Sequence, residues 1–335
     1  MKQISRFALI FIVSTASLSG CKTSDGSRSE TRALDAETPV ASDPANFPVK
    51  PTTAMDVVAS IEVGGDWMCI GFGSLWEPSG GKLMRVDPEQ HKVVATIEAS
   101  GNFCYAAPNG KVMWVADVYG GKLHRIDATT DTVTGTFNVP ISSGSEGSFA
   151  VTDGGVWVIT NNGGTSSGTL TRVDPTSGQV VADIKVANDS HGIAAAGNSI
   201  WVTSYSGNSV TRVNAQSNAV LATIPVGKSP RFIAGGEGGV WALCQGPGSV
   251  AHIDPESGKV VGEINTNTPG GGGDVAAGEG AVWVTTFGRP VTRIDPKTDK
   301  VIVQYQGEGF GDAIRAGAGY VWVSGGHLSQ IRPGN

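Results

Sequence analysis

The chain has 335 residues, with 24 basic and 30 acidic side chains, 48 glycines and only 16% charged residues. Glycine supplies the positive φ angles that tight turns need, so this composition is typical of a turn-rich β protein. No Gly-X-Y period is present, which excludes collagen, and apolar residues recur in short regular runs, which excludes disorder. No cluster of Lys or Arg interrupts the acidic sequence, so we expect no nucleic-acid partner.

The first twenty residues have the features of an export signal. Lys2 and Arg6 form a basic start, residues 7–13 form an apolar run, and residues 18–21 read LSGC. The apolar run is too short to remain as a membrane-spanning anchor, so we predict a cleaved signal peptide over residues 1–20. No later apolar stretch approaches the ~18 residues that a membrane-spanning helix needs. We therefore expect the body of the protein to be water-soluble.

The residues before the cleavage point resemble the lipobox of bacterial lipoproteins. This resemblance implies cleavage before Cys21, attachment of a diacylglycerol to its sulfur and acylation of the new N-terminus. More than one acyl chain on a residue gives stable anchoring without a transmembrane helix. We therefore expect a lipid-anchored protein of the cell envelope. Lys22 resembles the sorting preference of enteric bacteria for the outer membrane, which favours an outer-membrane protein that faces the periplasm.

Residues 21–55 are rich in Ser, Thr, Asp, Glu, Ala and Pro and contain one aromatic residue, Phe47. Such a composition predicts a flexible linker between the lipid and a folded domain over residues 56–335. Loss of Lys2 and Arg6 with the signal leaves 22 basic and 30 acidic side chains in the mature chain. The mature protein is thus more acidic than its precursor.

A tryptophan-centred repeat defines the domain. Tryptophan recurs at spacings of 38, 43, 44, 40, 42 and 39 residues, at positions Trp76, Trp114, Trp157, Trp201, Trp241, Trp283 and Trp322. Each unit contains four short apolar runs separated by turn residues, which predicts four strands. The third run ends in an Asp or Asn, often followed by Pro, which favours an Asx turn. The repeat therefore predicts a seven-bladed β-propeller of four-stranded blades.

The ends of the chain indicate how the propeller closes. The seventh unit stops at Asn335 without a fourth strand, whereas residues 57–63 (VVASIEV) precede the first tryptophan and match residues 93–99 (VVATIEA). An N-terminal strand that completes the last blade closes the ring and protects its edges. We therefore predict that residues 57–63 form the outer strand of blade 7. We also expect the closed ring to be a monomer.

Residues 207–214 (GNSVTRVN) and 222–230 (ATIPVGKSP) resemble the YVTN-repeat propellers. The Gly-x-x-x-Trp-Val-Thr pattern around the tryptophans resembles the streptogramin B (virginiamycin B) lyase branch of the same superfamily. In that branch the resemblance implies a His at the start of an inner strand, a Glu three residues after the Trp, and magnesium. Only His191 occupies the first position here, and its partner position holds Ser204. No blade contains the pair, so the sequence does not favour this lyase activity.

Functional residues are better sought where equivalent positions of the blades differ. The first residues of the inner strands lie nine to eleven positions before each Trp and line the central channel. They combine both charge signs, an imidazole and three aromatic rings, which suits a small polar or amphipathic ligand. The candidate ligand-binding residues are Trp67, Tyr105, Glu146, His191, Arg231, Phe232, Asp274 and Asp312. The competing interpretation is that polar side chains collect in the channel because it is filled with water, without binding a ligand.

His191 is the one weak candidate for catalysis, as a general base, and the favoured alternative is a structural or ligand-contacting histidine. No second His or Cys lies at metal-ligand spacing, which argues against His191 as a metal ligand. The carboxylates of Asp66, Glu146, Asp274 and Asp312 could hold Ca²⁺ or Mg²⁺. Their origin on four separate blades argues against such a site. No metal or other cofactor is therefore assigned.

Three cysteines remain besides Cys21. Cys69 and Cys104 lie on the inner strands of adjacent blades, and an exported chain meets oxidising conditions, so a disulfide is one alternative. Their positions relative to the tryptophans differ by three residues, which corresponds to ~10 Å along a strand. We therefore predict free, buried thiols, with Cys244 as a third.

Two classes of function agree with the sequence. The first is a membrane-tethered binding or scaffold module for a small molecule, glycan, peptide or envelope protein. The second is a lyase- or lactonase-type enzyme with its site at the channel mouth. The absence of the His and Glu pair, together with the lipid tether, favours the first class.

Overall fold

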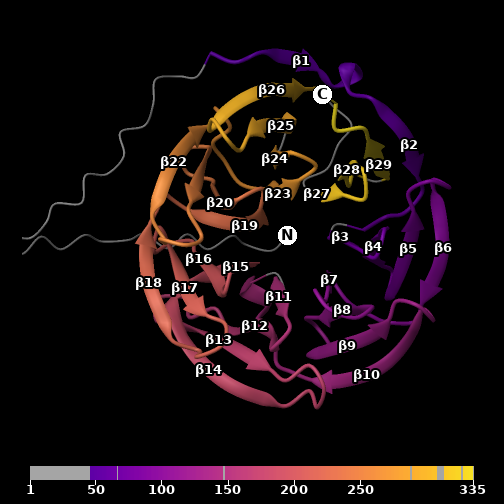
Figure 1. Ribbon diagram of the computed structural model, residues 1–335, viewed down its shortest axis with the longest axis vertical. Helices are drawn as coiled ribbons and strands as arrows, with labels where there is room; N and C mark the ends of the chain where they lie inside the picture. Colours follow the sequence, from indigo (N-terminus) through magenta and orange to yellow (C-terminus); the bar gives the residue numbers. More distant parts are fainter. Residues whose placement is uncertain are drawn as a thin grey trace, which may run out of the picture. The chain divides into compact units, whose positions relative to one another are not determined.

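Each tryptophan-centred repeat folds into one four-stranded antiparallel sheet, and seven such sheets surround a central channel (Figure 1). Short runs of β-branched residues form the strands, and Gly73, Gly238 and Gly319 provide the positive φ angles at their first hairpins. The structure is a computed structural model that describes residues 46–65, 67–145, 148–286, 289–307, 313–325 and 327–334. The predicted all-β, seven-bladed propeller is thereby confirmed.

The strands of each blade follow one another from the channel to the rim. Blades 1 and 2 contain β3 (Cys69–Gly71), β4 (Ser74–Ser79), β5 (Lys82–Asp87), β6 (Lys92–Ile97), β7 (Phe103–Ala106), β8 (Val112–Asp117), β9 (Lys122–Asp127) and β10 (Thr132–Asn138). Blades 3 and 4 contain β11 (Phe149–Thr152), β12 (Gly155–Asn161), β13 (Ser167–Val173), β14 (Val180–Asn188), β15 (Ser190–Ala196), β16 (Ser199–Ser204), β17 (Ser209–Asn214) and β18 (Val220–Pro225). Blades 5 and 6 contain β19 (Pro230–Gly236), β20 (Gly239–Cys244), β21 (Ser249–Ile253), β22 (Val260–Asn265), β23 (Asp274–Gly278), β24 (Ala281–Thr286), β25 (Arg289–Asp295) and β26 (Lys300–Gln306).

Blade 7 joins the two ends of the domain. It contains β27 (Ile314–Gly317), β28 (Tyr320–Val323) and β29 (Leu328–Ile331) from the C-terminal end, and β2 (Val57–Ile61) from the N-terminal end. β2 pairs with β29 in antiparallel register, from Val57 opposite Ile331 to Ile61 opposite Leu328. The N-terminal strand therefore closes the ring, although it ends at Ile61 rather than at residue 63.

A second N-terminal strand was not predicted. β1 (Val49–Pro51) runs parallel to β26 at the rim of blade 6, and the 3-10 helix η1 (Thr52–Ala54) follows it. Met55 is buried against Trp283 and Val321, between blades 6 and 7. These residues lie in the segment expected to be a flexible linker, yet this part of it packs on the propeller.

The repeated tryptophans form the centre of each blade. Their exposed fractions do not exceed 2%. In blades 1, 3, 4 and 6 an arginine on the third strand packs over the indole, with the guanidinium carbon 5.0 to 5.3 Å from the ring centroid. In blade 5 His252 takes this place, stacked on Trp241 at 3.8 Å. In these five blades the aromatic core is thus covered by a cationic or imidazole side chain.

The same third-strand side chains hold neighbouring blades together. At six of the seven junctions, this side chain reaches the hairpin between the third and fourth strands of the next blade. The contacts are Arg85 with Ala128 and Asp131, Arg125 with Pro175, Arg172 with Gln216 and Asn218, Arg212 with Glu256, His252 with Asp299, and Gln330 with Pro88. Blade 7 has no such hairpin, because its fourth strand is β2. At that junction the segment from β1 to Met55 bridges blades 6 and 7 instead.

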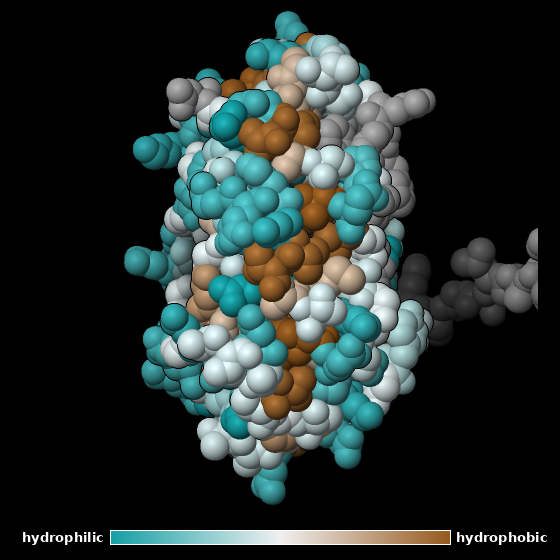
Figure 2. Space-filling view, turned by 90° about the vertical axis from the view of Figure 1, so that its right-hand side faces the viewer, coloured by the Kyte–Doolittle hydropathy of each residue, from teal (hydrophilic) through white to brown (hydrophobic). Residues whose placement is uncertain are grey.

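The rim carries apolar side chains between hydrophilic ones. Val57 on β2 and Val94 on β6 are both 42% exposed, and Figure 2 shows a broken apolar band along this side of the domain. Within the described residues, no helix is long and apolar enough to span a bilayer. The signal peptide, Cys21 and most of the predicted linker lie outside the described residues.

Candidate ligand site in the central channel

The inner strands enclose a cavity of about 300 Å³ along the propeller axis, lined by residues from all seven blades. Its floor consists of small residues such as Ala194, Ala276 and Ala316, and its polar groups gather where the inner strands begin. Six of the eight predicted ligand-binding residues line it: Trp67, Tyr105, His191, Arg231, Phe232 and Asp274. Glu146 and Asp312, like Asp66, lie outside the described residues.

An aromatic cluster spans the mouth of the channel. Trp67, just before β3 of blade 1, stacks on Phe103 of blade 2 with ring centroids 4.5 Å apart. It also lies 5.4 Å from Phe232 of blade 5, and the Arg231 guanidinium carbon lies 5.5 Å from the Phe232 ring. Blades 1 and 5 are not neighbours in the ring, so Trp67 reaches across the channel. A ligand that enters from this side meets these rings first.

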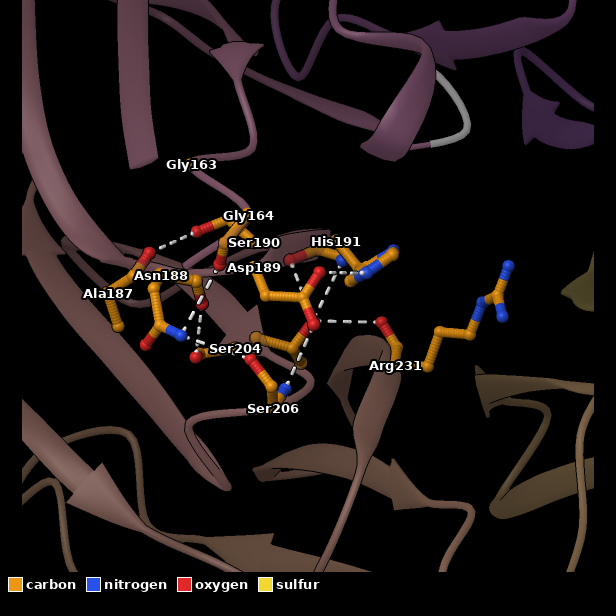
Figure 3. Close-up of polar contacts among 12 residues, drawn as sticks. Gly163, Gly164, Ala187, Asn188, Asp189, Ser190, His191, Ser204, Ser206 and Arg231 are labelled. Atoms are coloured by element: carbon orange, nitrogen blue, oxygen red, sulfur yellow. Dashed lines mark hydrogen bonds and ion pairs between the residues drawn. The ribbon is translucent and has the colours of Figure 1, made fainter. Parts of the chain in front are cut away.

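His191 is held by a carboxylate from its own blade. Its Nε2 lies 3.0 Å from Asp189 Oδ1, and Asp189 Oδ2 accepts a hydrogen bond from the Ser206 amide at 3.2 Å (Figure 3). Asp189 adopts a positive φ of 49°, which turns its side chain back toward the ring. Nε2–H donates to Asp189, and Nδ1 is an enclosed atom without a hydrogen-bond partner in the described chain. Figure 3 shows the imidazole of His191 and the guanidinium of Arg231 extending toward the channel.

Ser204, at the position where the resemblance to the lyases implies a Glu, has a structural role. Ser204 Oγ donates to the Asn188 carbonyl at 2.5 Å, and Thr203 Oγ1 donates to the Arg231 carbonyl at 2.8 Å. The partner of His191 is thus Asp189 and not a side chain three residues after Trp201. The carboxylate lies two residues before the histidine in the chain, where the resemblance to the lyases gives no reason to expect it.

An ion pair with a buried carboxylate forms part of the channel lining. Asp274 contacts Arg315 of blade 7 and accepts hydrogen bonds from the Val275 amide at 2.8 Å and the Ile314 amide at 3.2 Å. Burial raises the pKa of Asp274, although the Arg315 charge opposes this shift. Burial likewise raises the pKa of Tyr105, again opposed by Arg315. No hydrogen bond of the Tyr105 hydroxyl is found in the described part of the chain, so it can serve a ligand.

Arg315 is absent from the residues predicted to bind a ligand, although the sequence contains a signal for it. Five of the seven blades place a small residue opposite the central Trp on the inner strand, whereas blade 2 has Tyr105 there and blade 7 has Arg315. The residues seven positions before each Trp are Cys69, Ala107, Ala150, Ala194, Ala234, Ala276 and Arg315. Arg315 is the one charged residue in this set. It lies outside the window of nine to eleven positions before Trp from which the candidates were taken.

The prediction of free thiols at Cys69 and Cys104 was wrong. The two residues form a disulfide with a Cα–Cα distance of 5.6 Å, which joins the inner strands of blades 1 and 2. Cys69 lies opposite Trp76, whereas Tyr105 lies opposite Trp114, because the first hairpin of blade 2 is two residues longer. Counted by strand register, Cys104 is therefore one residue from the position equivalent to Cys69, and not three. Cys244 is a free, buried cysteine, as predicted.

The described residues contain no group of three or more His, Cys, Asp or Glu side chains that could hold a metal ion. Asp274 is the one described member of the four predicted carboxylate ligands, and it pairs with Arg315. Its carboxylate is thus engaged by a guanidinium and two backbone amides.

Comparisons with known proteins establish the fold. No protein-family profile and no curated protein matches the chain. Among solved structures, the β-propeller domain of Cps50 (Swd1) from Myceliophteria thermophila matches with a TM-score of 0.66 and 10% identity, over 84% of this chain and 100% of that chain. The structure of U3-55K matches with a TM-score of 0.67 and 10% identity, over 84% and 99% of the two chains. At this identity the likeness shows that the chain is a seven-bladed β-propeller.

Proposed function

We propose that the protein is a binding module of the bacterial cell envelope, tethered by a lipid on Cys21, whose propeller holds a small polar or amphipathic ligand at the channel mouth. The observation that carries this proposal is the cavity of about 300 Å³ with an apolar floor and convergent polar groups. Ligand sites in proteins commonly combine these two properties. The lipid anchor rests on the resemblance of residues 18–21 to a lipobox.

The chemistry of the lining favours a ligand with a flat apolar face and several hydrogen-bonding groups. Trp67, Phe103 and Phe232 offer ring faces. Tyr105 offers a hydroxyl for which no partner is found in the described chain, and His191 contributes an imidazole to the lining. Among the ligand classes that agree with the sequence, a saccharide unit or a short peptide fits this combination.

The proposal is tested by thermal unfolding of the mature protein against a panel of envelope saccharides, amino acids and short peptides. A ligand at a hundredfold excess over its Kd stabilises the folded state by about 2.7 kcal/mol. We expect stabilisation by at least one compound, lost in His191→Ala and Arg231→Ala and kept in the rim variant Lys185→Ala. Compounds that stabilise all variants equally would place the site elsewhere.

An enzyme of lyase or lactonase type is the second candidate. The specific observation in its favour is the contact of 3.0 Å between His191 Nε2 and Asp189 Oδ1, on a histidine that lines the cavity. A carboxylate that orients an imidazole is a common element of general-base catalysis. If a compound from the panel is turned over, His191→Ala should abolish turnover and Asp189→Asn should reduce it. Turnover that is unchanged in His191→Ala would exclude this role.

A further inference from the structure

Blade 2 differs from the other blades at its central tryptophan. In the other six blades the indole N–H donates a hydrogen bond to an oxygen five residues earlier, at 2.9 to 3.2 Å. In five of them the acceptor is a backbone carbonyl, as for Trp201 with Ala196. Trp114 Nε1 has no such partner within the described residues, and it is not among the enclosed atoms that lack one. The Trp114 side chain is 1% exposed, and it lines the groove described below.

Two features of the sequence cause this difference. The first hairpin of blade 2 is two residues longer than that of blade 1, so the Asn109 carbonyl does not accept from the Trp114 indole. In addition, Phe137 occupies the position of Ile97, Ile184, Ile224 and Ile264 in other blades. Its ring lies 5.9 Å from Trp114, and Arg125 packs over Phe137 rather than over the indole. Arg125 therefore does not pack over the Trp114 indole as the equivalent arginines do in other blades.

This arrangement leaves a groove of about 510 Å³ between blades 2 and 3. It is lined by the two first hairpins and by the hairpin that begins at Asp174. These lie at the opposite ends of the inner strands from the channel mouth, so the groove is separate from the channel site. Its lining includes Pro108, Trp114, Arg125, Asp127, Asp153 and Pro175.

We propose that this groove binds an extended peptide segment of a partner protein, with a backbone carbonyl that accepts the hydrogen bond of Trp114 Nε1. The fold supplies the precedent, because a peptide carbonyl fills this role in five other blades. An extended segment with proline is suited to a narrow groove because its backbone groups are not engaged in internal hydrogen bonds.

The charged side chains that line the groove indicate which charge the bound peptide carries. Arg125 donates its hydrogen bonds to neutral oxygens, to Pro175 at 3.2 Å and to Thr134 at 3.2 Å. Asp127 and Asp153 contribute two carboxylates, and neither forms an ion pair among the described residues. Their sum with Arg125 is one negative charge. The segment is therefore basic, with a Lys or Arg near the bound carbonyl.

The test uses the mature chain labelled with 15N at its indole nitrogens, with Trp114→Phe to assign the resonance. Without ligand, we expect the Trp114 indole proton to exchange with solvent faster than those of the other six repeat tryptophans. Three capped peptides serve as probes: acetyl-Ala-Pro-Lys-Pro-Ala-amide and the same sequence with Glu or Ala in place of Lys. The Lys peptide should shift the Trp114 resonance in a saturable manner and leave Trp67 unchanged.

Charge variants complete the test. Asp153→Asn should weaken binding of the Lys peptide about two- to fivefold, the range of an exposed ion pair. Glu256→Gln, which removes one negative charge from the hairpin between β21 and β22 of blade 5, away from the groove, should leave the affinity unchanged. Slow exchange of the Trp114 indole, or no shift with any of the three peptides, would overturn the proposal. Equal affinity for the Lys and Glu peptides would overturn the assignment of a basic segment.

Discussion

Gln330 on the last strand of blade 7 donates a hydrogen bond to the Pro88 carbonyl of blade 1 at 2.8 Å, and its Oε1 lies 2.8 Å from His91 Nδ1. This contact joins the C-terminal end of the chain to the first blade, and the Gln330 side chain is fully buried. It is the counterpart of the arginine contacts at the other junctions. The ring is thus closed twice, by strand β2 and by this side chain.

Gln330→Ala should destabilise the propeller by about 1–3 kcal/mol, because it leaves the buried Pro88 carbonyl and His91 without partners. The free energy of unfolding in urea measures the effect. Gln179→Ala, an exposed glutamine in the hairpin after β13, is the matched control and should lie within about 0.5 kcal/mol of wild type. Equal stability of the two variants would show that this contact does not hold the ring closed.

The disulfide between Cys69 and Cys104 should form under oxidising conditions and contribute about 2–4 kcal/mol to stability. In a Cys21→Ala background, alkylation of the denatured protein without reductant should label Cys244 alone, and reduction should expose the other two cysteines. Cys104→Ser should lower the free energy of unfolding, whereas Cys244→Ser should have a smaller effect. Labelling of all three cysteines without reductant would contradict the disulfide.

The Asx turns predict how the free energy of unfolding depends on pH. Backbone N–H groups that donate to the carboxylates lower the pKa of Asp87, Asp174 and Asp295 below the usual 3.8. For a carboxylate with a lowered folded pKa, the contribution to stability is present above pH ~4 and is lost as the pH falls through the folded pKa. Asn214 makes the same turn with an amide, so replacement by Asn should keep the fold.

The combined variant Asp87→Asn, Asp174→Asn and Asp295→Asn should therefore lose less stability than wild type between pH 5 and pH 3. Urea unfolding at several pH values measures the two slopes. Equal slopes for variant and wild type would show that these three turns do not contribute to acid unfolding.

Much of the fold could be predicted because the same residue pattern, with the same structural consequence, recurs along the chain. Most blades share the same short first hairpin, a small residue that faces the Trp and an Asx turn, so one unit predicts the next. The strand β1 could not be predicted in this way. It has three exposed residues, belongs to no repeat, and is defined by pairing with β26, more than 250 residues away.

His191 and Asp274 were predicted because they lie ten and nine positions before their Trp, within the window from which the candidates were taken. Arg315 lies seven positions before Trp322 and was missed for that reason. The disulfide was missed because a hairpin changes length. The longer hairpin of blade 2 moved Cys104 and Tyr105 out of alignment, and it concealed both the disulfide and the special environment of Trp114. Spacing in sequence is a guide to spatial equivalence only while hairpin lengths are constant.

The two classes of tryptophan should also differ in stability measurements. Trp201→Phe removes a hydrogen bond to the Ala196 carbonyl and the packing of Arg212, whereas Trp114→Phe removes neither. We expect Trp201→Phe to cost about 1–2 kcal/mol more than Trp114→Phe, because the carbonyl of the half-buried Ala196 loses its donor. Urea unfolding of the two variants gives this difference directly. A larger loss for Trp114→Phe would contradict the hydrogen-bond pattern on which the groove depends.

The most direct test of a ligand site at the channel mouth is isothermal titration of the most stabilising compound from the panel. For wild type and Lys185→Ala we predict one site per chain with the same Kd. For His191→Ala and Arg231→Ala we predict a Kd at least about tenfold weaker, a change of about 1.4 kcal/mol. An unchanged Kd in both channel variants would contradict the site.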